Sequence, residues 1–389
     1  MIRLRPSGVD EVLIKRVRDW YEPGPGVFFT GIAGTASFSP AMLFTTGVNG
    51  AWYDPSDLTT LFQDAAGTTP VTAMEQPVGR MLDKSGRGNH AFNPTTPGTA
   101  TFPVLSARYN LYVNTETLAT QNVTTAATNY KLTFTGSGSI TLSGTATGTY
   151  SAGSYTIACT AGTLTSTVSG TVTQADIRPA NESIGQPAYQ RVGNVAVTAS
   201  DYDTVGFKPY LSFTPGTKWL QTNSIDFTNT AQMFVSAGVR KLSDAAAGSF
   251  LEFGNSGGTW QSGSFGWAAP SSATGKDYQF VSRGASAQTA PTTPASYQVP
   301  ITNVVSSESS PASASSYVRG RVNGVQVTSS ATDQGGGNYG NYPLYIGART
   351  GNQLWFNGRL HQLVVAGKQA SASEITNTET YLNQKTGAY

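Results

Sequence analysis

The sequence predicts an all-β protein: a β-sandwich with a second, small β-sandwich inserted into it and one helix at the C-terminus. Three observations predict this class. Runs of alternating apolar and polar residues recur along the chain and are separated by turn residues. Charged residues make up only 12% of the 389 residues, whereas glycine reaches 43. Aromatic residues make up 11% and the net charge is +2, so the composition favours a packed protein over a disordered chain.

Residues 1–47 differ from the rest of the chain. Apolar residues at spacings of three and four predict a short amphipathic helix with Lys15, Arg16 and Arg18 on its other face, and these apolar residues are Val9, Val12, Leu13, Val17 and Trp20. The Pro-Gly repeat of residues 22–26 ends this pattern. Such a segment either anchors the protein to a partner or lies as an arm on its own domain, and the sequence leaves both open.

The main sandwich is predicted to be split by an insertion. Its first part spans residues 48–105 and its second part residues 186–389. Between them, residues 106–185 contain short alternating strands with Gly-Ser and Ala-Gly turns, which is typical of a small antiparallel sandwich. An insertion into an exposed loop is tolerated because the entropy cost of loop closure grows slowly with loop length.

The second part of the main sandwich contains one segment of loop-like composition and one clear hairpin. Residues 284–316 are rich in Ser, Ala, Thr and Pro, so we expect mostly surface loop, with a possible strand at 297–305. Asn323-Gly324 then joins two alternating runs, and both residue types tolerate the positive φ angles of a type I′ turn. Residues 343–347 and 355–365 supply two further strands.

A capping box predicts the start of the C-terminal helix. Ser371 and Glu374 stand at the spacing at which the hydroxyl and the carboxylate each accept from a free backbone N–H group. The helix beginning there carries Ile375, Tyr381 and Leu382 toward the core.

Two segments resemble known families. The Asn-Gly hairpin, the Ile-Gly pair, residues 356–360 (FNGRL) and the Ser-x-x-Glu-Ile helix start resemble the C-terminal half of laminin G-like, concanavalin A-type lectin or glucanase domains. Residues 51–67 and 81–91 resemble the opening of such domains in bacteriophage and prophage virion proteins. The first resemblance implies a concanavalin A-like jelly-roll sandwich. The second implies a virion protein made in the host cytoplasm, and we expect no signal peptide.

Few residues are suited to catalysis. His90 and His361 are the only histidines, no Gly-x-Ser-x-Gly elbow is present, and we expect His361 to be structural. The Glu-x-Asp-x-x-Glu pattern of sandwich glycoside hydrolases is also missing, and Glu252 has no acidic neighbour at the required spacing. We therefore expect no enzyme and no cofactor, and keep a polysaccharide-degrading hydrolase as an alternative.

Metal and redox chemistry are also disfavoured. Asp83 and Asn89 flank a glycine-rich stretch that superficially resembles a calcium loop, but one carboxylate at this spacing favours a connecting turn. We expect no metal site. Cys159 is the only cysteine, so no intrachain disulfide forms, and its position in an alternating run predicts a buried thiol.

Aromatic and amide side chains in glycine-rich loops are the candidates for glycan binding, because sugars offer C–H groups to rings and hydroxyls to amides. These candidates are Trp260, Asn338, Tyr339, Asn341 and Tyr342. The same loops are also used for subunit contacts in virion proteins, and that alternative remains open.

The sequence thus predicts a non-enzymatic virion structural protein, either a tail fibre or appendage or a capsid decoration protein. Residues 1–47 would bind other virion proteins, and the lectin-like body would bind host surface polysaccharide. A purely structural decoration protein without a ligand is the alternative. We expect a homo-oligomer, no membrane span, since no apolar run is long enough, and no nucleic-acid partner, since basic residues do not cluster.

Overall fold

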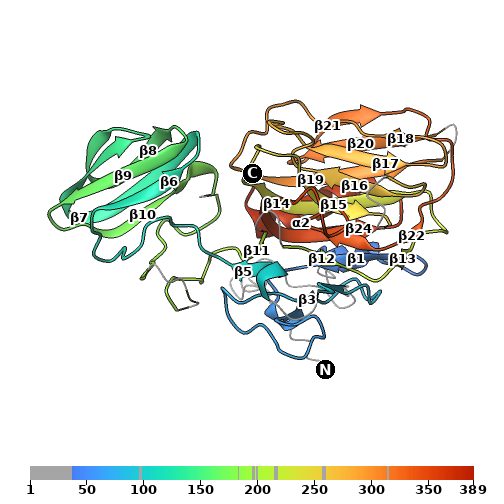
Figure 1. The fold of residues 1–389 in the computed structure, drawn as a ribbon, viewed down its shortest axis with the longest axis horizontal. Helices are drawn as coiled ribbons and strands as arrows, with labels where there is room; N and C mark the ends of the chain where they lie inside the picture. Colours follow the sequence, from blue (N-terminus) through green and yellow to red (C-terminus); the bar gives the residue numbers. More distant parts are fainter. Residues whose placement is uncertain are drawn as a thin grey trace, which may run out of the picture. The chain divides into compact units, whose positions relative to one another are not determined.

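The computed structural model describes residues 37–95, 99–182, 184–194, 198, 200–213, 218–255, 260–312 and 315–389. The helix predicted within residues 9–20 lies outside the described residues. Two large antiparallel sheets form the main sandwich (Figure 1). The structure confirms the predicted fold class: an all-β protein whose sheets form a sandwich, with a separate inserted sheet and one C-terminal helix.

The first sheet has eight strands in the order β21-β20-β19-β14-β24-β11-β5, and β1 also pairs with β24. Its strands are β1 (Gly50–Tyr53), β5 (Val104–Ser106), β11 (Tyr210–Phe213), β14 (Met233–Lys241), β19 (Ile301–Ser310), β20 (Tyr317–Val322), β21 (Val325–Ser330) and β24 (Gly358–Ala366).

The second sheet has nine strands in the order β18-β17-β16-β15-β23-β12-β4-β3-β2. Its strands are β2 (Leu61–Phe62), β3 (Arg80–Met81), β4 (Ala91–Phe92), β12 (Leu220–Gln221), β15 (Ser249–Phe253), β16 (Phe265–Ala268), β17 (Gln279–Arg283), β18 (Gln288–Thr289) and β23 (Leu344–Ile346). A separate pair joins β13 (Ile225–Asp226) to β22 (Asn341–Tyr342).

The main core lies between the two sheets, and the alternation of β14 shows how the strands divide their side chains. Met233, Val235, Ala237 and Val239 belong to this core, together with residues of the nine-stranded sheet. Phe234 points the other way and joins a second cluster under the helix. Successive side chains of a strand point to opposite faces of the sheet, so β14 contributes apolar side chains to both faces of the eight-stranded sheet.

The only α-helix in the described part of the chain, α2 (Ala372–Thr386), packs on the outer face of the eight-stranded sheet. Its capping box is present as predicted: Ser371 accepts from the Glu374 N–H, and Glu374 accepts from the Ser371 N–H. Ile375 and Leu382 are buried against the cluster that contains Phe234. The short 3-10 helix η1 (Pro40–Leu43) brings Leu43 into the same cluster.

Residues 284–316 contain a serine-rich central strand, which overlaps the possible strand predicted at 297–305 and is longer and more buried than a surface loop would be. β19 (Ile301–Ser310) is almost wholly buried and pairs with β14 on one side and β20 on the other. Its serine hydroxyls are satisfied inside the protein: Ser306 bonds to Ser236, and Ser307 accepts from the Trp267 indole. Buried hydroxyls are tolerated when they find such partners.

The inserted β-domain is a five-stranded sheet with its own apolar core. Its strands are β6 (Gln121–Thr125), β7 (Thr128–Gly144), β8 (Gly148–Cys159), β9 (Gly162–Ser169) and β10 (Thr173–Pro179), and they lie within the predicted 106–185 segment. β7 has a register shift between Phe134 and Ser139, where Gly136 adopts a φ of 106°. Cys159 is buried in this core, as expected.

The strands that flank the insertion pair with each other, since Ser106 of β5 lies opposite Tyr210 of β11. The insertion therefore leaves and re-enters the eight-stranded sheet at neighbouring positions. Three further 3-10 helices occur at η2 (Leu58–Thr60), η3 (Thr99–Thr101) and η4 (Ala180–Glu182). No helix of the described residues has the length and apolar character that a membrane crossing requires.

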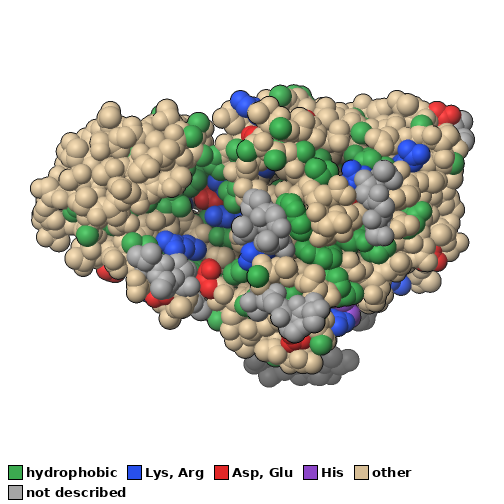
Figure 2. All heavy atoms as spheres, viewed as in Figure 1, with side chains coloured by type: hydrophobic (Ala, Val, Ile, Leu, Met, Phe, Trp, Pro, Cys, Tyr) green, Lys and Arg blue, Asp and Glu red, His purple; other side chains and the backbone are tan. Residues whose placement is uncertain are grey.

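Charged side chains are sparse on the surface. Figure 2 shows Lys, Arg, Asp and Glu in small, separate groups on the face in view. This distribution agrees with the 12% charged content of the sequence. Recognition by this surface therefore depends mainly on uncharged polar groups and on a few individual charges.

Candidate functional site

Of the five side chains that the sequence singles out for glycan binding, Tyr339 lies in the core. It is 1% exposed, and its hydroxyl bonds to Ser282 and Ser309. Its ring packs edge-on against Phe265, at 5.5 Å between centroids. A ring enclosed between the sheets is out of reach of a ligand in solution, so this residue is removed from the candidate site.

Trp260 is half-buried and lies against Arg349, the ion-pair partner of the buried Glu252. The Arg349 guanidinium lies 4.9 Å from the Trp260 ring centroid, and its Nε is 3.3 Å from Glu252 Oε1. The same ring lies so close to Gly266 that a Cβ there would come within 2.5 Å of it. The indole is thus held on the sheet surface by its own neighbours.

The other three candidates lie at the edge of the sandwich. Asn338 is exposed, but its amide donates to the Thr228 carbonyl. Asn341 is exposed and pairs with Asp226 in the β13–β22 ladder. Tyr342 is half-buried and donates its hydroxyl to the Ser262 carbonyl at 3.0 Å. The structure brings these three together, but Trp260 lies against Arg349 and Gly266 of β16 instead.

A different set of side chains lines up on the outer face of the nine-stranded sheet. Pairing places Arg80 opposite Phe92, Phe92 opposite Gln221 and Gln221 opposite Tyr345. The residues next to them along each strand, including Met81 and Leu220, point into the core. Because side chains alternate along each strand, these four side chains form one continuous row on the outer face of the nine-stranded sheet.

One end of this row opens into a pocket of about 330 Å³, which we call the Arg80 pocket. Its polar and aromatic lining comes from three separate parts of the chain, and the lining residues are Ala65, Arg80, Gly88, Asn89, His90, Phe92 and Asn223. The volume is within the usual range for small-molecule sites, about 300–1,000 Å³. The pocket combines a cation, two amides, an imidazole and an aromatic ring.

The Arg80 guanidinium has N–H groups that do not donate to any described residue. Its Nη1 donates to the carbonyls of Ala65 and Ala66 at 3.4 and 3.2 Å, which orients the guanidinium. Its Nε is buried and has no hydrogen-bond partner in the described part of the chain. A guanidinium has five N–H donors, so the N–H groups of Arg80 other than Nε remain for an acceptor oxygen of a ligand in the pocket.

His90 presents a neutral imidazole to the pocket. Desolvation and the nearby Arg80 charge lower the pKa of His90 below its ordinary value of 6.5. Its Nδ1 accepts from the Asp83 backbone N–H at 3.0 Å. The proton of the neutral ring therefore sits on Nε2, which makes that atom a hydrogen-bond donor.

The turn that carries His90 is organised by Asp83, not by a metal. One carboxylate oxygen accepts from the backbone N–H groups of Trp52 and Ser85, and the other accepts from the Ser85 hydroxyl and the Asn89 N–H. The Asn89 amide donates in turn to the Gly50 carbonyl at 2.7 Å. Both carboxylate oxygens of Asp83 therefore already accept hydrogen bonds from groups of the protein itself. Among the described residues, no group of three or more His, Cys, Asp or Glu side chains could hold a metal ion.

Two of the acid–base groups, Glu252 and His361, are enclosed. Burial raises the pKa of Glu252 to about 7, although Arg349 and the Thr350 N–H oppose this shift. Burial also lowers the pKa of His361 to about 3, and its ring packs against Tyr210. Glu252 is 1% exposed and His361 is 2% exposed. Both side chains therefore occupy structural positions.

Comparisons with known proteins give structural similarity only. No family model matches the sequence, and no curated protein matches it. The CBM40 module of an IT-sialidase from Ruminococcus gnavus, bound to α2,3-sialyllactose, is similar with 15% identity and a TM-score of 0.31, over 41% of this chain and 97% of that one.

Two further structures are similar over comparable lengths. The binding domain of botulinum neurotoxin serotype C1 has 10% identity and a TM-score of 0.34, over 50% of this chain and 46% of that one. A heptameric SAP-like pentraxin from Limulus polyphemus has 15% identity and a TM-score of 0.34, over 46% and 80%. Each of the three structures is matched by no more than half of this chain.

The Arg80 pocket was not predicted from the sequence. Strands β3 and β4 have two residues each, which is too short for period-two alternation to show that Arg80 and Phe92 share a face. Asn223 comes from a distant part of the sequence and joins them only through the pairing of β12 with β4. The resemblance of residues 51–67 and 81–91 to virion domains covers part of this region, but it predicted no binding site there.

Proposed function

We propose that the chain is a non-enzymatic, lectin-like protein that binds a glycan in the Arg80 pocket. The observation that carries this proposal is that the Arg80 guanidinium, the Phe92 ring and the Asn89 and Asn223 amides line one pocket. A guanidinium binds paired oxygens in a fixed geometry, and an aromatic ring packs against the C–H face of a sugar. The amides of Asn89 and Asn223 would orient the hydroxyls.

The polarity of the pocket favours acceptor-rich sugars. Arg80 is the only charged residue among those that line it, and the neutral His90 ring supplies a further donor at Nε2. Sugars with carboxylate or other anionic oxygens therefore match the pocket better than sugars with amino groups. Polysaccharide on a host cell surface is the ligand class that we propose.

The proposed setting is a bacteriophage virion. Its support is the resemblance of residues 51–67 and 81–91 to virion domains, and these two segments supply Ala65, Gly88, Asn89 and His90 of the Arg80 pocket. In this proposal the body is displayed on a tail appendage or on the capsid as a homo-oligomer. Residues 1–47 attach it to other virion proteins.

A non-enzymatic role fits the position of Glu252. Its carboxylate is 1% exposed and is held by Arg349, whose guanidinium lies against the Trp260 ring. A purely structural decoration protein is the second candidate, and the exposed amides of Asn338 and Asn341 at the sandwich edge favour it as a subunit contact.

Binding of the full chain to host surface polysaccharide, measured by biolayer interferometry, tests the proposal. We expect Arg80→Gln to weaken binding at least tenfold and Asn341→Ala to leave it unchanged. Arg191→Gln is the matched control, because Arg191 is an exposed arginine in a surface ion pair with Asp203. Loss of binding in Asn341→Ala alone would move the site to the sandwich edge.

Two further results bear on the other parts of the proposal. Absence of polysaccharide binding by the wild-type chain would favour the decoration role. Release of new reducing ends from the polysaccharide would contradict the non-enzymatic role.

A further inference from the structure

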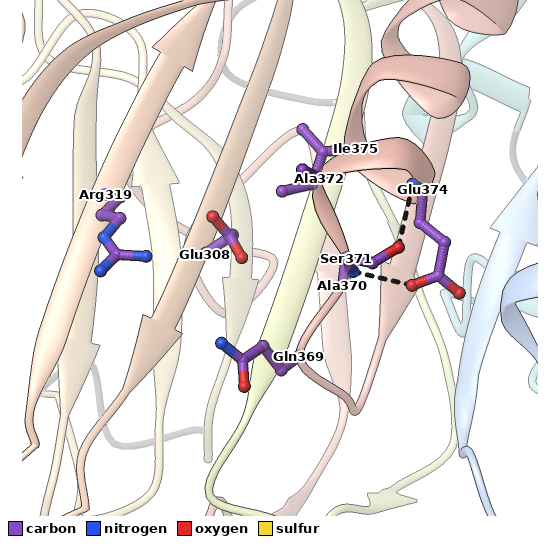
Figure 3. A pocket seen from close by; sticks show the side chains of 8 residues that line it. All are labelled: Glu308, Arg319, Gln369, Ala370, Ser371, Ala372, Glu374 and Ile375. Atoms are coloured by element: carbon purple, nitrogen blue, oxygen red, sulfur yellow. Dashed lines mark hydrogen bonds between the residues drawn. The ribbon is translucent and has the colours of Figure 1, made fainter.

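A second pocket lies on the other sheet, at the start of α2, and has a volume of about 510 Å³ (Figure 3). We call it the helix-start pocket. Glu308 of β19 and Arg319 of β20 form one wall, and Gln369, Ala372 and Ile375 form the other. It shares no residue with the Arg80 pocket, so its role is independent of the function proposed above.

Glu308 is a buried carboxylate without a bonding partner. It is 8% exposed, and no described residue donates a hydrogen bond to it or forms an ion pair with it. Each of the other buried carboxylates among the described residues has a cationic partner, and these are Asp54, Asp176, Glu182, Glu252 and Glu379. A cation offsets the cost of burial in those five sites, whereas the Glu308 carboxylate has no cationic partner among the described residues and faces the pocket.

The strand geometry explains why Arg319 does not fill this role. Arg319 lies directly opposite Glu308 in the β19–β20 ladder, but its guanidinium stacks over the Tyr317 ring at 4.5 Å from the centroid. Arg321, the next cation on that face, is paired with Glu379 of α2 at 2.8 Å. Desolvation therefore raises the pKa of Glu308 in spite of both arginines.

The side chains around Glu308 leave space next to it. Figure 3 shows the Glu308 carboxylate directed into the pocket, between Arg319 and the first turn of α2. Alanines at positions 370 and 372 are too short to cover it. The first turn of the helix also places Glu374 in the lining, where its carboxylate accepts from the Ser371 N–H and pairs with Lys368. Arg319 is therefore the only cation among the lining residues.

We propose that the helix-start pocket binds a small zwitterion, whose ammonium group pairs with Glu308 and whose carboxylate faces Arg319. The aliphatic part of such a ligand would contact Ala372 and Ile375. This arrangement gives Glu308 a cationic partner like those of the five other buried carboxylates. The proposed ligands are therefore small aliphatic amino acids.

Isothermal titration of the full chain with three matched probes tests both charges. L-Leucine carries both groups, 3-methylbutylamine lacks the carboxylate, and 4-methylpentanoate lacks the ammonium. We expect leucine to bind and each of the other two to bind at least tenfold more weakly. Absence of leucine binding, or equal binding of 4-methylpentanoate, would overturn the proposal.

Variants then locate the site. Glu308→Gln should weaken leucine binding at least tenfold, and Arg319→Gln should weaken binding of leucine and 4-methylpentanoate but not of the amine. Glu116→Gln is the matched control, because Glu116 is an exposed acid in the inserted β-domain. Undiminished leucine binding by Glu308→Gln would refute the assignment.

A variant that fills the pocket separates a loss of binding from a loss of stability. Ala372 is exposed at the first position of α2, so Ala372→Leu should fill the pocket without disturbing the core. We expect it to abolish leucine binding while the urea unfolding midpoint stays at the wild-type value. Unchanged binding in this variant would place the ligand elsewhere.

Discussion

Replacing Gly238 by alanine should destabilise the packing of α2 on the eight-stranded sheet. Gly238 lies on the helix side of β14, where a Cβ atom would be 1.9 Å from Thr386 Oγ1 and 3.1 Å from Thr386 Cβ. Thr386 is 3% exposed and donates its hydroxyl to the Leu382 carbonyl, so it has little freedom to move. The helix or the strand must therefore shift.

The expected cost follows from this overlap. Overpacking a core typically costs about 1–3 kcal/mol, and a contact this short places Gly238→Ala near 3 kcal/mol. Combining it with Thr386→Ala removes the hydroxyl and the methyl group, leaves only the 3.1 Å contact between the two Cβ atoms, and should restore most of the loss.

Equilibrium urea unfolding, followed by tryptophan fluorescence, measures these differences. Gly193→Ala is the control, because its Cβ would meet its nearest atom at 3.4 Å, an ordinary contact. A Gly238→Ala protein within about 0.5 kcal/mol of wild type, the usual range for harmless substitutions, would refute the packing described for α2.

Three further predictions concern buried polar groups. Burial raises the pKa of Glu252 from 4.5 to about 7, so the folded protein holds a proton that the unfolded chain has released between these pH values. The free energy of unfolding should therefore fall as the pH rises through this window. Urea unfolding at pH 5 and pH 8 measures this fall, which should be smaller in Glu252→Gln than in the wild type. Asp83→Asn should weaken polysaccharide binding in interferometry, because Asp83 orders the turn that holds Asn89 and His90. Tyr339→Phe should cost about 1–3 kcal/mol in urea unfolding, since two buried serines lose their partner, and should leave polysaccharide binding unchanged.

The sequence correctly predicted the features whose contacts lie within a few residues of one another. Asn323 and Gly324 adopt φ angles of 49° and 80°, as the predicted hairpin turn requires. The capping box of Ser371 and Glu374 also forms as predicted. Both features depend on residues within one turn, so neighbouring residue types determine them.

Features that depend on distant contacts were not predictable in this way. Tyr339 stands in a glycine-rich stretch that is typical of an exposed loop, but its ring is buried against Phe265 and its hydroxyl is bound by serines of β17 and β19. β19 itself has a loop-like composition, and only its pairing with β14 and β20 explains its burial. Arg80 likewise becomes part of a site only through the register of the nine-stranded sheet.

A glycan microarray probed with the wild-type chain and with Arg80→Gln tests the central claim most directly. We expect the wild type to bind a subset of glycans that carry carboxylate or other anionic oxygens, and Arg80→Gln to lose that binding while remaining folded. Binding of the same glycans by both proteins, at equal strength, would contradict a glycan site in the Arg80 pocket.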